Sequence, residues 1–163
     1  MARFEEPYED IESLFDEVVV NQSTLPPSVN IKLLADNKSK KIFKVMRAND
    51  LLKYRTGDDV IIIINQNIFE QLTDVQKMIV AEEAVAYIAY DMDKDKVLIT
   101  EPDFLAHSGI LRKHTFEVIE NVRETIKSLY DAENQSEDEC EAATQRCINQ
   151  CSIILEQHKL SSD

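Results

Sequence analysis

The sequence predicts an α+β fold, in which a small and partly antiparallel sheet packs on a central helix and an extra helix follows at the C-terminus. Two observations favour this class: apolar residues recur at helical spacing over residues 73–91, and the aliphatic run Val60–Ile64 has the length of a strand. The chain has 163 residues, of which 44% are hydrophobic, so it can bury a core. We expect a single domain over residues 1–133, followed by a linker and the extra helix over residues 134–163.

The N-terminal part of the chain predicts one helix and two strands. Residues 5–20 suit an amphipathic helix, and Pro26 and Pro27 mark the loop after it. Residues 29–34 and 42–46 alternate like strands, and the polar turn 36–39 joins them as a pair. The predicted buried face of the helix is Ile11, Leu14, Phe15, Val18 and Val19.

The next segment predicts the centre of the fold. Asn49 can cap a short turn, and Ile68 and Phe69 lie in another short turn further along. Between them, the strand Val60–Ile64 is apolar on both faces, which is typical of a central strand.

Residues Thr73–Asp91 predict the best-marked helix of the chain. Thr73 and Gln76 form a capping-box signature at its start. Glu82 falls on the apolar stripe of this helix, and Glu83 follows it directly. A carboxylate on a core face costs free energy unless it is paired, so Glu82 indicates a functional site or the remnant of one. The stripe consists of Val75, Met78, Ile79, Val85, Ala86 and Ala89.

The C-terminal part predicts a short strand and two further helices. Residues 91–96 form a charged turn before a strand over 97–100, and residues 101–109 are irregular or briefly helical. A helix follows over His114–Tyr130, and a last helix over residues 136–158. The expected buried side of the first of these helices is Val118, Ile119, Val122, Ile126 and Leu129.

The charge is strongly acidic and unevenly distributed. The net charge is −13, yet residues 30–55 carry eight basic side chains against Asp36 and Asp50. This segment is either a binding patch for an acidic protein partner or a solvated strand pair. Free nucleic acid is disfavoured as a ligand, because phosphate contacts supply much of such affinity. The candidate partner-binding side chains in this segment are Lys38, Lys40, Lys41 and Lys44.

The cysteines and the length of the apolar runs indicate the cellular compartment and a possible contact between chains. Cys140, Cys147 and Cys151 cluster in one segment, which is no disulfide framework and favours reduced thiols. Cys147 and Cys151 lie one helical turn apart and suit packing on another helix or chain, so residues 136–158 are a candidate contact for a homo-oligomer. No run approaches the roughly 20 apolar residues of a membrane helix, and no secretory signal is visible. We therefore expect a cytoplasmic protein that binds no membrane.

The residues around the two adjacent acids resemble a known family. Val60–Gln76 joins an aliphatic strand, a turn with an aromatic residue and a Leu-Thr-x-x-Gln segment that leads into the helix. This arrangement is similar to the zinc metallopeptidases encoded by many bacteriophages, and the likeness covers residues 29–120. It implies a zincin-like domain, whose His-Glu-x-x-His motif supplies two zinc ligands and a general base.

The resemblance fails at the metal ligands. With Glu83 aligned to the general base, the two histidine positions hold Glu82 and Ala86. The family's later histidine maps to Pro102, His107 or His114. We therefore take Glu82, Glu83 and His114 as the remnant of a site, and predict neither a bound metal nor another cofactor. Simpler interpretations are a hydrogen-bonded core acid for Glu82, an exposed acid paired with Lys77 or Arg112 for Glu83, and structural roles for both histidines.

These observations lead to one main hypothesis and two alternatives. The main one is a non-catalytic, metallopeptidase-like accessory protein that binds a protein partner in the host cytoplasm. That partner would belong to host transcription, to a defence system or to phage assembly. The alternatives are an active metal-dependent peptidase with an atypical site, and a structural protein that self-associates.

Overall fold

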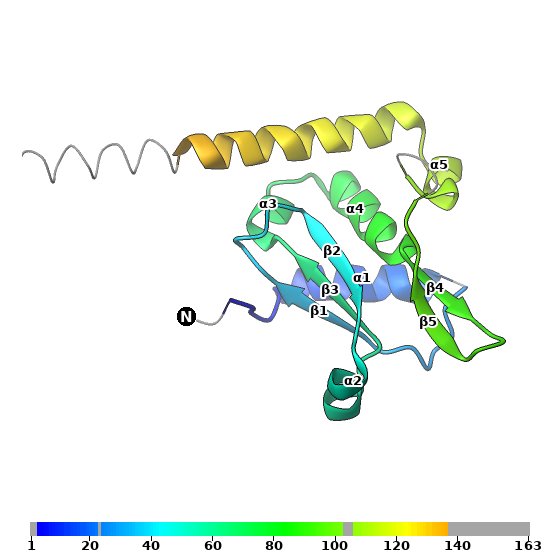
Figure 1. Cartoon of the computed structure of the whole chain (residues 1–163). Helices are drawn as coiled ribbons and strands as arrows, with labels where there is room; N and C mark the ends of the chain where they lie inside the picture. The colour runs from blue at the N-terminus through cyan, green and yellow to red at the C-terminus, as the bar shows by residue number, and fades with distance from the viewer. Residues whose placement is uncertain (1–2, 23, 103–105, 137–163) are drawn as a thin grey trace, which may run out of the picture. The chain divides into compact units, whose positions relative to one another are not determined.

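The computed structural model describes residues 3–22, 24–102 and 106–136. The chain divides into two compact units, Met1–Ile126 and Lys127–Asp163. The first unit has a mixed α+β architecture with a three-stranded and a two-stranded sheet, which confirms the predicted fold class (Figure 1). The cysteines and nearly all of the predicted helix over residues 136–158 lie outside the described residues. The division into 1–133 and 134–163 stays a prediction.

The larger sheet contains β1 (Ile31–Ala35), β2 (Phe43–Arg47) and β3 (Val60–Ile64) in the order β1-β3-β2. β3 is parallel to β1 and antiparallel to β2, so its predicted central place is confirmed. The expected direct pairing of the first two strands is wrong, because β3 lies between them. β3 carries apolar side chains on both faces, and the centre of the sheet is where such a strand loses most water-exposed surface.

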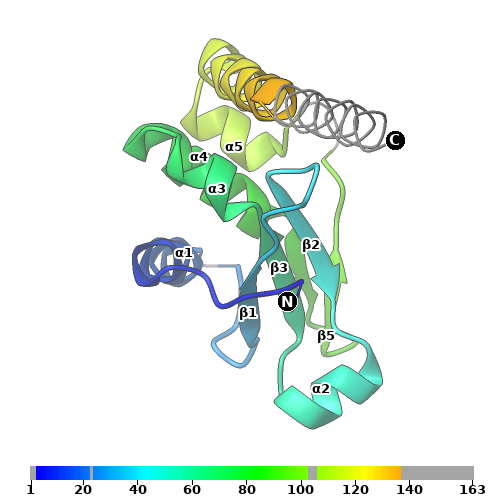
Figure 2. The same cartoon turned by 90° about the vertical axis from the view of Figure 1, so that its left-hand side faces the viewer.

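Two helices cover one face of this sheet, α1 (Glu9–Asn21) and α4 (Asp74–Ala86) (Figure 2). Ile11, Phe15 and Val18 of α1 are buried, as predicted. The helix begins at Glu9 and not at residue 5, because Glu5 forms two backbone hydrogen bonds with Ala35, of 2.9 and 3.0 Å, at the edge of the sheet. The sheet residues buried on this side are Leu33, Ala35, Val60, Ile62 and Ile64.

The short helices lie at the ends of β3. α2 (Asp50–Thr56) begins at Asn49, whose side chain accepts a hydrogen bond from the Leu52 N–H, as its predicted cap requires. α3 (Gln66–Glu70) begins at Asn65 and includes the fully buried Ile68 and Phe69.

The predicted helix over Thr73–Asp91 is right at its start and wrong at its end. Thr73 and Gln76 form the capping box, but α4 ends at Ala86. Residues Ile88–Asp91 form β4, which pairs with β5 (Lys96–Ile99) in an antiparallel hairpin. The backbone groups that would have extended the helix are thus satisfied by a strand partner.

The remaining described helices are α5 (Ser108–Lys113) and a helix that covers residues 116–136. The predicted buried positions Ile119 and Val122 are buried, whereas Val118 is 39% exposed. On α4, Val75 is 66% exposed, so the predicted stripe is wrong there. α4 instead buries Val80, Ala81 and Ala84 as well as Ile79 and Val85, because neighbouring elements cover several sides of it. Within the described residues, no helix has both the length and the apolarity needed to cross a membrane.

Candidate functional site

Glu82 lies on the side of α4 that faces the end of α5. Its Oε1 accepts a hydrogen bond from Nζ of Lys113 at 2.9 Å, and its Oε2 accepts one from Nε2 of His114 at 2.7 Å. Lys113 is the last residue of α5 and His114 is its C-cap. The carboxylate is therefore held by two side chains that lie more than thirty residues away in sequence.

A small apolar cluster brings α5 to this position. Ala106, Ile110 and Ile119 are buried together, and Ala86 of α4 packs against them with Leu111. Burial of these side chains supplies a favourable hydrophobic free energy, which fixes α5 beside the second half of α4. The ion pairs at Glu82 follow from that docking.

Burial and pairing act in opposite directions on Glu82. Burial alone would raise the pKa of its carboxyl group, because it disfavours the charged form. The hydrogen bonds from His114 and Lys113 and the positive charge of Lys113 outweigh that effect, so the pKa lies below its ordinary value. Glu82 is thus a hydrogen-bonded acid that stays ionised, in agreement with the simpler interpretation of its sequence position.

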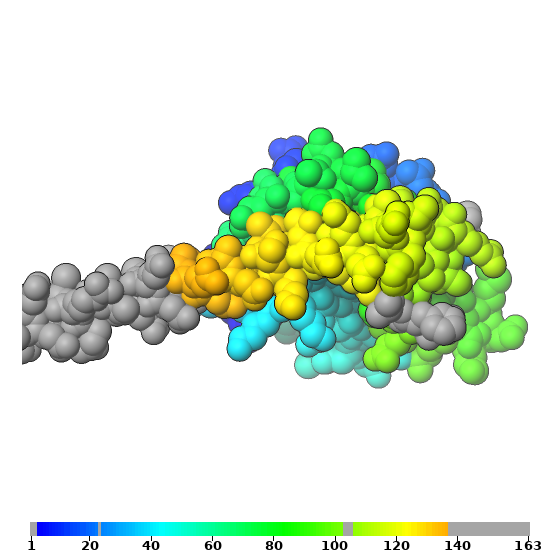
Figure 3. Space-filling model, turned by 90° about the horizontal axis from the view of Figure 1, so that it is seen from above, coloured from blue at the N-terminus to red at the C-terminus, as the bar shows by residue number. Residues whose placement is uncertain are grey.

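Glu83 has a different environment and a different partner. Its side chain is only 12% exposed, and its Oε1 accepts a hydrogen bond from a guanidinium nitrogen of Arg123 at 3.0 Å. The prediction of an exposed acid paired with Lys77 or Arg112 is therefore wrong. Lys77 pairs with Glu70 at 3.3 Å. Residues 116–126 of the last described helix, drawn in yellow in Figure 3, run beside α4. The hydrogen bond from Arg123 to Glu83 joins these two segments.

A pocket of about 250 Å³ opens beside Glu82. Ala86, one helical turn after Glu82, lines the same pocket and offers only a methyl group there. The apolar part of the wall comes from α1, α4 and α5. Its lining includes Val18, Met78, Glu82, Ala86, Ile110 and Lys113.

The other candidates for the third ligand are not brought to Glu82 in the same way. The ring of His107 meets the ring of Tyr87 edge to face, with centroids 4.7 Å apart. Pro102 offers no side-chain donor atom. Of the three alternatives, His114 is the one that contacts Glu82.

The donor set does not fit a catalytic zinc ion. Such a site needs three protein ligands and an open position, and Ala86 supplies no donor atom. Within residues 3–22, 24–102 and 106–136, no group of three or more histidine, cysteine, aspartate or glutamate side chains is placed to hold a metal. The Lys113 ammonium would also repel a cation at Glu82.

Sequence reasoning missed Lys113 and Arg123. A buried acid requires a cation, but nothing in the chain's local pattern indicates which of 18 lysine and arginine residues supplies it. The only usable signal was the position of Lys113 directly before the suspected His114.

The predicted partner-binding lysines lie on another part of the molecule. Lys38, Lys40 and Lys41 are exposed in the connection between β1 and β2, and Lys44 is exposed on β2. Cys147 and Cys151, the other predicted contact residues, lie outside the described residues.

The fold and the site together define a class: a small α+β protein whose central helix carries two adjacent acids, each paired with a cation of the same chain. The chain belongs to the family described as "Putative phage metallopeptidase", whose family model matches residues 2–132. No curated protein and no solved structure matches the chain.

Proposed function

We propose that this chain is a non-catalytic member of the phage metallopeptidase family, and that it acts by binding a protein partner in the cytoplasm of an infected bacterium. The partner would belong to host transcription, to a defence system or to phage assembly. One observation carries the proposal: both oxygens of Glu82, at a motif ligand position, are engaged by Lys113 and His114.

The chemistry of the motif supports a loss of metal binding. A zinc site gains its affinity from lone pairs that converge on the ion. Here the first position holds an acid neutralised by an ammonium group, and the second position is Ala86. An internal cation thus takes the electrostatic role that the metal ion has in a catalytic site, and the fold keeps its acid without the metal.

The state of Glu83 supports a loss of catalysis. A general base must reach a water molecule or the substrate with a free lone pair, at about 2.6–3.2 Å. Glu83 is buried and accepts a hydrogen bond from Arg123. That contact occupies Oε1, one of the two oxygens with which a general base would take up a proton.

The first test is the metal content of the purified protein. We expect elemental analysis to find far less than one zinc ion per chain, and a chelator to leave the melting temperature unchanged. One zinc ion per chain, together with a peptidase activity that Glu83→Gln abolishes, would overturn the proposal in favour of the atypical enzyme.

A double substitution tests the physical reason for that result. Ala86→His with Lys113→Ala adds an imidazole one turn from Glu82 and removes the competing ammonium group. We expect this variant to take up zinc when the wild-type protein does not. The matched control is Ala89→His with Lys94→Ala on the β4–β5 hairpin, which should gain no zinc. If Ala86→His with Lys113→Ala also binds no zinc, then Ala86 and Lys113 do not explain the absence of zinc binding.

A further inference from the structure

The face of the larger sheet opposite α1 and α4 carries an apolar surface. Ile61 and Ile63 of β3 alternate with the fully buried residues of that strand and are only half-buried. Leu34 and Met46 lie beside them in the register of β1 and β2, and are half-buried as well. In Figure 1 no described helix of the unit Met1–Ile126 lies in front of the near side of these strands.

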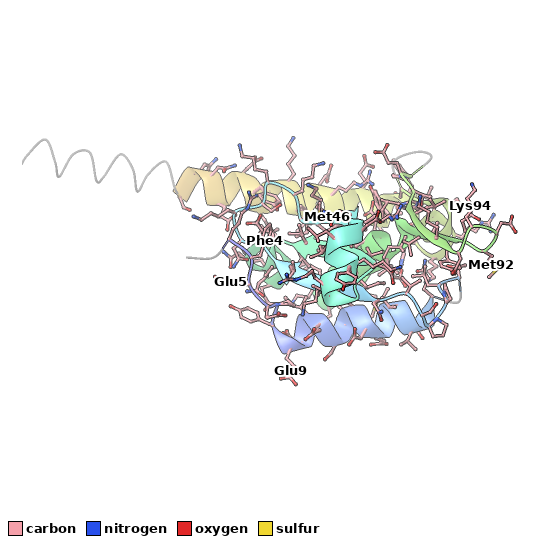
Figure 4. The ribbon with its side chains drawn as sticks, turned by 60° about the horizontal axis from the view of Figure 1, so that its bottom comes forward. Phe4, Glu5, Glu9, Met46, Met92 and Lys94 are labelled. Atoms are coloured by element: carbon pink, nitrogen blue, oxygen red, sulfur yellow. The ribbon has the colours of Figure 1, made fainter. Side chains whose placement is uncertain are left out.

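The N-terminal segment extends this surface. Glu5 pairs with Ala35, whose side chain points to the helix-covered side, so Phe4 and Glu6 lie on the opposite side. The ion pair between Glu6 and Lys32, at 2.8 Å, agrees with that placement. Phe4 is 44% exposed, and Figure 4 labels it together with Met46. We name the set Phe4, Leu34, Met46, Ile61 and Ile63 the open face.

Lysines border the open face on the β2 side. Lys44 pairs in register with Ile63 and therefore points to the open face, and Lys40 and Lys41 lie in the connection that leads into β2. We name Lys40, Lys41 and Lys44 the basic rim. Within the part of the chain that the structure describes, the basic rim forms no ion pair, whereas Lys32, Lys53, Lys77 and Lys113 each have an acidic partner.

The connection that carries the rim is held in place. Asn65 is 1% exposed, and its side-chain amide donates a hydrogen bond to the Ser39 carbonyl oxygen at 2.9 Å. The Asn65 N–H donates to the Ile42 carbonyl oxygen, also at 2.9 Å. The lysines are thus presented from a fixed backbone, which lowers the entropy cost of binding.

We infer that the open face with its basic rim binds an acidic protein segment that also carries apolar side chains. The apolar side chains would cover the open face, and the carboxylates would pair with the basic rim. Nucleic acid suits the surface less well, because a polyanion laid across it would meet Glu6 at the opposite edge. The inference deepens the proposed function by naming the chemistry of its partner.

The test is binding of a labelled synthetic peptide with leucines at one end and glutamates at the other, followed by fluorescence anisotropy. Lys41→Glu with Lys44→Glu should lower the affinity about tenfold or more, and Phe4→Ser about threefold. The matched controls are Lys94→Glu with Lys96→Glu on the hairpin and Tyr54→Ser on α2, and each should stay within about twofold of the wild type. Leucine peptides with lysines in place of glutamates should not bind.

Several results would overturn the inference. Absence of peptide binding, or an equal loss in the hairpin control, would show that the surface has no specific role. Tighter binding of single-stranded DNA through the same lysines would identify nucleic acid as the ligand. A dimer that dissociates on Lys41→Glu with Lys44→Glu would identify a second copy of the chain. None of these substitutions touches Glu82 or His114, so the zinc measurement and the peptide measurement fail independently.

Discussion

The acids of α4 and the lysines beside β2 are the two charged regions of this protein that sequence patterns single out, and they differ in how their charges are balanced. Glu82 and Glu83 are each paired with cations of the same chain. Lys40, Lys41 and Lys44 have no such partner among the described residues. A paired, partly buried charge contributes to the fold, whereas an exposed charge without a partner is available to another molecule. The contrast separates a region whose charges are balanced within the fold from the region that we propose for partner binding.

The largest effect should come from breaking the ion pair between the buried Glu83 of α4 and the partly exposed Arg123. Arg123→Ala leaves the Glu83 carboxylate buried without its cation, so we expect the free energy of unfolding to fall by about 3 kcal/mol. Urea denaturation measures this change. Arg112→Ala, at an exposed position close by in sequence, should change it by less than about 0.5 kcal/mol. If both variants lose the same free energy of unfolding, the pair between Glu83 and Arg123 contributes no more to stability than an exposed side chain does.

The second effect concerns the support of the basic rim. Asn65→Ala removes the amide that holds the Ser39 carbonyl oxygen and the oxygen that accepts from the Ile68 N–H, so we expect a loss of about 2 kcal/mol. Peptide binding should weaken in parallel, because the rim loses its fixed backbone. Asn67→Ala, at an exposed neighbour, is the control and should leave both quantities nearly unchanged. If Asn65→Ala has the stability and the peptide affinity of the wild type, the connection between β1 and β2 does not depend on the Asn65 side chain.

The third effect depends on pH and concerns Glu82. A carboxyl group whose pKa is lowered by folding stabilises the native state above its unfolded pKa of about 4.3, and this contribution is lost as the pH falls through the folded value. Glu82→Gln should therefore cost about 1 kcal/mol at pH 7, and the difference from the wild type should shrink as the pH falls and the Glu82 carboxylate becomes protonated. Thermal melts across this range measure the trend. Glu120→Gln, at an exposed position, should show no such convergence.

The smallest effect should come from the basic rim. Lys41→Gln with Lys44→Gln removes two exposed charges that have no ion partner among the described residues, so the free energy of unfolding should change by less than about 0.5 kcal/mol while peptide affinity falls. A loss of stability as large as that of Arg123→Ala would remove the distinction between the two regions.

The sequence predicted the parts of the fold that depend on local pattern. The capping box at Thr73, the cap at Asn49 and the two-sided strand Val60–Ile64 each follow from a few neighbouring residues. The end of α4 did not, because Ile88–Asp91 suits a helix as well as a strand until Lys96–Ile99 pairs with it. The prediction that the first two strands pair directly was wrong for the same reason, because strand order depends on contacts between residues that are distant in sequence.

The candidate site was likewise predicted only in part from the sequence. The unusual acid at Glu82 was visible in the stripe of α4, and its contact with His114 was among the alternatives that the family resemblance left open. The cations that neutralise the two acids were not visible, because Lys113 and Arg123 reach α4 only through the packing of Ile110 and Ile119. The functional role of Glu82, Glu83 and His114 stays a prediction that the zinc measurement tests.

The bridge between Glu5 and Ala35 has a consequence for how molecules of this protein meet. An outer strand of a sheet offers unpaired backbone groups to which a strand of another molecule can add. Here the N-terminal residues occupy the end of β1 themselves, and the Glu6–Lys32 pair lies alongside. A chain shortened by its first six residues would present that border bare, and would be prone to stack strand upon strand into insoluble aggregates.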